Sequence, residues 1–182
     1  MPEGAAQSGD KEPVTARQGS LDDDLARLRR FLETRNLAAA DRLSETLIRS
    51  GAESRALPML GKVKFFLNQF AAAEKLWAEA LQANMLISLD VIHRHDAADG
   101  FCLGQLKFKK KMILFNSHSR GDHSFALPAG AARSCTLENG TTIRLGGVVG
   151  GLEISGDFLL AAKLRRLEKE RFLVAFINRY VF

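Results

Sequence analysis

Apolar residues recur every three or four positions from Leu21 to Leu81, the spacing that places them on one face of an α-helix. Ser20, followed three residues later by Asp23, has the form of a capping pair and predicts that the first helix begins there. The pattern is interrupted at three positions that divide it into four expected helices: Asn36, Gly51 and Asn68. Residues 1–19 are small, polar or charged, and we expect them to form a disordered tail.

The last two of these helices place small residues around one large ring. Gly61 lies on the third expected helix, and Ala73 and Trp77 lie one turn apart on the fourth. Close packing of two helices needs small side chains where they meet and a large one to fill the remaining space. We therefore expect Trp77 to fill the gap between Gly61 and Ala73.

The chain repeats itself within this helical part. Residues 36–43 (NLAAADRL) align with residues 69–76 (QFAAAEKL) at an offset of 33, and each position is identical or similar. The residues that add an order of small and large side chains to this period are Leu60, Gly61, Ala73, Trp77 and Ala80. Together they resemble the tetratricopeptide repeat, whose period is about 34 residues.

That resemblance implies a protein that binds other proteins and carries out no chemistry. A peptide or helix of the partner would lie in the groove of the helix pairs, with Lys64 and Asn68 lining it. Two helix pairs leave an apolar face uncovered, so we expect the second half of the chain, or a second copy in a homodimer, to cover it. The apolar residues 85–87 between the halves are expected to lie in that seam.

After Asn84 the apolar period changes to two, which predicts strands. The expected strands are 86–96, 100–108, 111–117, 123–127, 132–137, 141–145 and a kinked strand from 152 to 161. Asn139-Gly140 is a two-residue hairpin signal, whereas residues 146–151 are expected to be a flexible connection. The helical period returns over residues 164–180.

About seven short strands followed by one helix is the element order of a pleckstrin-homology domain. The residues that also resemble bacterial versions of that domain are Cys102, Gly104, Leu106, Ile113, Phe115, His123, Ser124 and Phe125. The resemblance implies an antiparallel barrel or sandwich capped by the C-terminal helix. We therefore predict an α+β chain, with a tetratricopeptide-like domain at residues 20–84 and a pleckstrin-homology-like domain at residues 85–182.

Two histidines alternate on the first expected strand, and alternate residues of a strand share a face. His93 and His95 could therefore point at one metal ion, with His123 and Cys102 on the following segments. A metal site needs three or four converging ligands, and the spacing shows no convergence. We expect hydrogen-bonded core or interface histidines, without a metal or cofactor; a metal-dependent enzyme is the alternative.

Four lysines surround the turn of the expected hairpin at residues 107–111: Lys107, Lys109, Lys110 and Lys111. They could bind anionic lipid or phosphate, at about 1 kcal/mol per charge near an anionic membrane. The chain would then be a peripheral membrane module. The simpler interpretation is a charged turn that prevents sheets from associating edge to edge.

Composition narrows the class of protein. The formal charge of +5 lies entirely in residues 86–182, because residues 1–85 hold equal numbers of basic and acidic side chains. Cys102 and Cys135 are too few for a disulfide framework, and the sequence shows no signal peptide, membrane span or catalytic motif. We therefore expect a cytoplasmic, non-enzymatic adaptor that binds protein and no nucleic acid.

Overall fold

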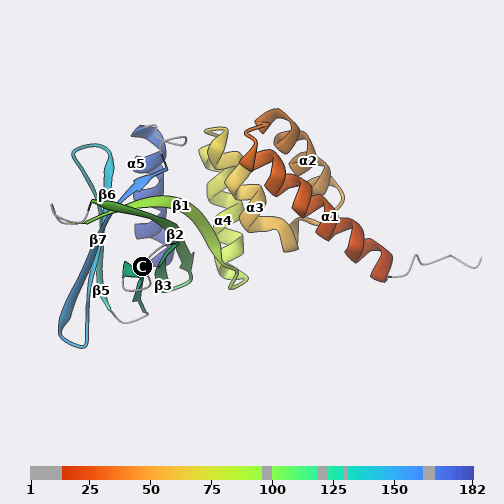
Figure 1. Ribbon diagram of the computed structural model, residues 1–182. Coiled ribbons are helices and arrows are strands. Elements are labelled where there is room, and N and C mark those ends of the chain that lie inside the picture. Colours follow the sequence, from red (N-terminus) through yellow and green to blue (C-terminus); the bar gives the residue numbers. More distant parts are fainter. Residues whose placement is uncertain (1–13, 96–99, 119–122, 129–130, 162–166) are drawn as a thin grey trace, which may run out of the picture.

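The computed structural model describes residues 14–95, 100–118, 123–128, 131–161 and 167–182 (Figure 1). Its helical half holds α1 (Val14–Glu33), α2 (Leu37–Arg49), α3 (Glu53–Phe66) and α4 (Phe70–Gln82). The strands are β1 (Ile87–Arg94), β2 (Phe101–Lys109), β3 (Met112–Ser117), β4 (Phe125–Leu127), β5 (Ala132–Glu138), β6 (Thr142–Val149) and β7 (Leu152–Leu160). The chain then forms α5 (Leu167–Phe176) and a π-helix, Ile177–Val181. The predicted α+β order of helical hairpins, antiparallel strands and a C-terminal helix is confirmed.

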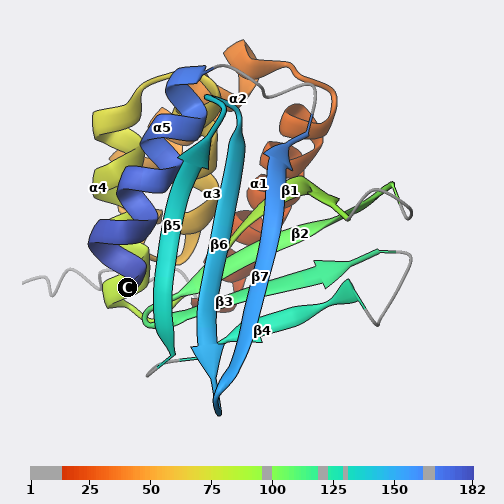
Figure 2. The ribbon, with the colours of Figure 1, turned by 90° about the vertical axis from the view of Figure 1, so that its left-hand side faces the viewer.

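The seven strands form one sheet in the order β4-β3-β2-β1-β7-β6-β5, and neighbouring strands are antiparallel. β1 pairs with β2 from Ile87 to Arg94 but with β7 only from Val91 to Arg94. The sheet therefore changes direction at β1, and its two arms, β4 to β1 and β7 to β5, cross one another (Figure 2). α5 packs against β5 and β6.

Strand β1 shows how the sheet separates its two faces. Ile87, Leu89, Val91 and His93 are buried, whereas the alternate residues are partly or fully exposed. Because side chains alternate across a strand, one face of β1 builds the core and the other remains available to a neighbouring surface. His93 is thus held in the interior by the same alternation that buries the aliphatic residues.

The glycine-rich segment after residue 145 differs from its prediction as a flexible connection. β6 continues through it to Val149, pairing Gly146 with Ser155 and Gly147 with Ile154 of β7. Backbone hydrogen bonds hold such a ladder and require no side chains. The turn lies instead at Gly150-Gly151, where both φ angles are positive, 57° and 84°.

The ends of the first and last helices also differ from the predictions. α1 begins at Val14, so residues 14–19, predicted to lie in the tail, are helical, and Ser20 is inside the helix and does not cap it. Residues 1–13 of the predicted tail lie outside the described residues. α5 begins at Leu167, and the helix beyond Phe176 widens into the π-helix. The predicted residues 162–166 of that helix also lie outside the described part.

An aromatic seam joins the helical half to the sheet half. Its members are Phe65, Trp77, Phe108, Phe172 and Phe176, with ring centroids such as Trp77–Phe176 and Phe65–Phe172 at 5.5 and 5.8 Å. Lys169 of α5 adds a hydrogen bond from its Nζ to the Phe66 carbonyl, at 3.0 Å. The predicted packing of the two halves is therefore present, although the linker contributes only in part, since Ile87 is buried and Leu86 is 44% exposed.

Trp77 lies at the centre of this seam and is fully buried. A Cβ placed on Gly61 would lie 2.2 Å from Trp77 Cδ1, so only glycine allows the ring to approach α3 this closely. The indole Nε1 donates to the Pro58 carbonyl at 3.1 Å, which satisfies its polar atom. The predicted packing of Trp77 on Gly61 is confirmed.

Candidate functional site

A groove of about 710 Å³ lies between α1 and α3 on one side and β1 and β2 on the other. Its larger apolar side chains include Leu25, Leu32, Met59 and Leu86. Its charged side chains are mainly basic: Arg29, Arg55, Lys62 and Lys107, against Glu33 and Asp90. The groove thus combines partly exposed aliphatic surface with a net positive charge.

The basic side chains of the groove are only loosely held. Lys62 Nζ lies 3.7 Å from Asp90 Oδ2, and the other carboxylate oxygen of Asp90 accepts from Gln105 Nε2 at 3.3 Å. Arg55 reaches Asp22 Oδ1 at 3.5 Å, with both side chains at least half exposed. Exposed pairs at these distances contribute little free energy, so these cations can turn toward an acidic ligand at small cost.

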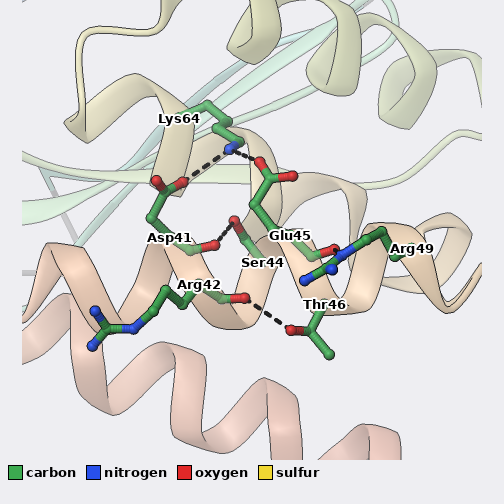
Figure 3. Close-up of polar contacts among 7 residues, drawn as sticks. All are labelled: Asp41, Arg42, Ser44, Glu45, Thr46, Arg49 and Lys64. Atoms are coloured by element: carbon green, nitrogen blue, oxygen red, sulfur yellow. Dashed lines mark hydrogen bonds and ion pairs between the residues drawn. The ribbon is translucent and has the colours of Figure 1, made fainter.

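The structure places Lys64, a predicted partner-binding residue, away from this groove. Its ammonium donates to Asp41 Oδ1 at 2.9 Å and to Glu45 Oε1, both on α2 (Figure 3). Burial lowers the pKa of Lys64, but the hydrogen bonds to Glu45 and Asp41 outweigh it and raise that pKa above its ordinary 10.5. Lys64 therefore joins α2 to α3.

Asn68, the second predicted partner-binding residue, lies in the turn that ends α3. It is exposed, with a φ of 61°, and does not line the groove. The residues of α3 that do line it form a stripe at helical spacing: Arg55, Met59, Lys62 and Phe66. That stripe of mixed basic and apolar residues was the signal in the sequence that could have identified the groove.

A second cluster, the histidine pocket, lies inside the sheet where β1 meets β2 and β7. The ligating atoms of His93, His95 and Cys102 all lie within 4.8 Å of one another, and Cys102 Sγ is 3.8 Å from His93 Nδ1. The His123 ring lies 4.1 Å from the His95 ring, centroid to centroid. The structure therefore brings together all three predicted candidates and the cysteine.

The walls of the histidine pocket are aromatic. His93 stacks on Phe158 at 5.0 Å and contacts Phe115 at 4.9 Å, while Phe125 lies 6.2 Å away. Burial, reinforced by the neighbouring His95 and His123, lowers the pKa of His93 to about 4. His93 is therefore neutral at pH 7, the form in which imidazole binds a metal.

The lysines of the β2–β3 hairpin do not act as one patch. Lys110 and Lys111 are exposed at the turn, and the Lys111 amide donates to the Val181 carbonyl at 3.1 Å. Lys109 is half-buried at the end of β2, and Lys107 lines the groove. The tip thus presents two exposed lysines, and its fourth basic residue belongs to another surface.

Comparison with known proteins found no family model that matches this chain and no match among curated proteins. In the described ranges, no helix has both the length and the apolar character needed to cross a membrane. The groove and the histidine pocket are therefore interpreted from their own geometry.

Proposed function

We propose that this chain is a non-enzymatic adaptor that binds a segment of a partner protein in the groove between α1, α3 and the β1–β2 hairpin. The observation that carries the proposal is the lining of that groove, in which aliphatic and loosely held basic side chains alternate. The offset of 33 residues between the hairpins and the use of their first helices as one wall support a tetratricopeptide-like mode of binding.

The chemistry of the groove specifies its ligand. Arg29, Arg55 and Lys62 favour Asp or Glu in the bound segment, and Leu25 and Met59 offer contacts for aliphatic side chains. The sheet forms the second wall, so its resemblance to a pleckstrin-homology domain is proposed to reflect a supporting role beside the helices. The expected ligand is a short acidic segment that also carries Leu, Ile or Met.

Selection of a displayed library of random peptides on the immobilised full chain tests this proposal. The enriched peptides should combine acidic and aliphatic residues. The double variant Arg29→Glu, Arg55→Glu should weaken an enriched peptide at least about tenfold, or about 1.4 kcal/mol. The matched control is Arg42→Glu, Lys75→Glu, which reverses two exposed charges outside the groove and should leave affinity unchanged.

Two results would overturn the proposal. One is the absence of any enriched acidic-aliphatic peptide. The other is equal loss of affinity in the groove variant and in the control, because net charge alone would then govern binding.

A further inference from the structure

The histidine pocket has a composition that hydrophobic packing does not explain. His93 and Cys102 are 9% and 6% exposed, and they lie directly opposite one another on β1 and β2. His95 Nε2 is buried without a hydrogen-bond partner in the described part of the chain. A buried polar atom without a partner costs free energy, and a bound group that accepted its lone pair would remove that cost.

We propose that His93, His95 and Cys102, with His123 as the fourth ligand, bind one zinc-type transition-metal ion. Zinc prefers imidazole nitrogen and thiolate sulfur in a tetrahedral arrangement, with bonds of about 2.0 to 2.3 Å. Ligating atoms in that arrangement lie roughly 3.3 to 3.8 Å apart. The three atoms now within 4.8 Å of one another therefore need to approach by about 1 Å, which side-chain rotation supplies.

Binding balances in charge and protons. The neutral imidazoles donate nitrogen lone pairs, and Cys102 gives up its thiol proton to solvent as the sulfur–metal bond forms. The ion can reach the site from the surface, because a polar hollow of about 720 Å³ extends to His93 and His95. A second, smaller hollow also reaches His95.

The bound ion would have a structural role. Its ligands come from β1, from the residue that follows β1, from β2 and from the segment that precedes β4. One ion would therefore tie together strands that are distant in sequence, at the end of the sheet opposite to the aromatic seam. This role is compatible with an adaptor, because four protein ligands leave no open position for a substrate.

The chain contains its own controls for a test. His118 is exposed and outside the pocket, and Cys135 is the remaining cysteine, buried where desolvation raises its pKa to about 12. Full-length protein stripped with a chelator would be titrated with Zn²⁺ by calorimetry and with Co²⁺ by absorption spectroscopy. Cobalt reports tetrahedral geometry and thiolate ligation directly in its spectrum.

We expect one ion per chain, a cobalt spectrum with a sulfur-to-metal band, and a melting temperature that rises with zinc. Cys102→Ser should abolish the sulfur band, and His95→Ala should weaken zinc binding at least about 100-fold. His118→Ala and Cys135→Ser should change neither. A folded wild-type protein without stoichiometric binding, or binding that survives both pocket variants, would overturn the proposal.

Discussion

The two hairpins carry the same local sequence, yet their second helices serve different neighbours. Ala40 of α2 and Ala73 of α4 stand 33 residues apart, and both are fully buried against their own hairpin. The next residue in each helix is an acid that binds the following element. Asp41 pairs with Lys64 of α3, whereas Glu74 pairs with Arg179 and accepts from the Tyr180 hydroxyl at 2.9 Å.

This correspondence shows what closes the helical array. The C-terminal helical segment stands beside α4 as α3 stands beside α2, and it supplies Phe172 and Phe176 to the ring of Trp77. A third hairpin is therefore not needed, because the sheet half provides its substitute. The difference between α2 and α4 teaches that a repeat residue takes its role from the next element in space.

Separating the halves should have the largest effect on this comparison. Residues 14–84 expressed alone would expose the face of α4 that carries Trp77, and we expect that fragment to self-associate or to lose cooperative unfolding. The full chain should unfold in one transition by circular dichroism and fluorescence alike. A monomeric fragment with the stability of the full chain, in sedimentation and denaturant measurements, would contradict the closing role of the C-terminal segment.

Trp77→Ala should produce the next largest effect. It removes the ring that contacts Phe65, Phe108 and Phe176, and truncation of a large buried side chain costs about 3–5 kcal/mol. Chemical denaturation measures the change, and Trp77→Phe should recover much of the loss. A cost under about 1 kcal/mol would remove the aromatic seam as the main link between the halves.

The sequence predicted the parts that depend on local pattern. The helix and strand order follows from apolar period, and the contact of Trp77 with Gly61 follows from the order of small and large residues. The choice between Lys62 and Lys64 as the groove residue could not be predicted, because both lie on exposed-looking faces of α3 until the sheet and α2 are placed.

Long-range geometry also hid the histidine pocket. His93 and His95 share a strand face, which the sequence shows, but Cys102 and His123 reach them only because β1 pairs with β2 and the sheet bends. The run 146–151 misled for the opposite reason: glycine composition indicated a connection, while the backbone ladder with β7 made most of it a strand.

Lys64→Ala should cost about 1–2 kcal/mol, less than the tryptophan change. It removes two charge-assisted hydrogen bonds, but Asp41 and Glu45 are 34% and 49% exposed and can return to water. The control is Lys62→Ala, two residues away in the groove, which should cost under about 0.5 kcal/mol because its 3.7 Å pair is loose. Equal costs in denaturant unfolding would show that Lys64 does not hold α2 on α3.

The smallest effect belongs to the position that matches Trp77. Ser44 stands 33 residues before it and is fully buried, with its Oγ donating to the Asp41 carbonyl at 2.7 Å (Figure 3). That carbonyl belongs to the same helix, so Ser44→Ala loses a local bond and gains helix propensity of a few tenths of a kcal/mol. We expect stability to change by less than about 0.5 kcal/mol in denaturant unfolding. A loss above about 2 kcal/mol would mean that the first hairpin relies on this position as the second relies on Trp77, and the two hairpins would then be equivalent in energy as well as in sequence.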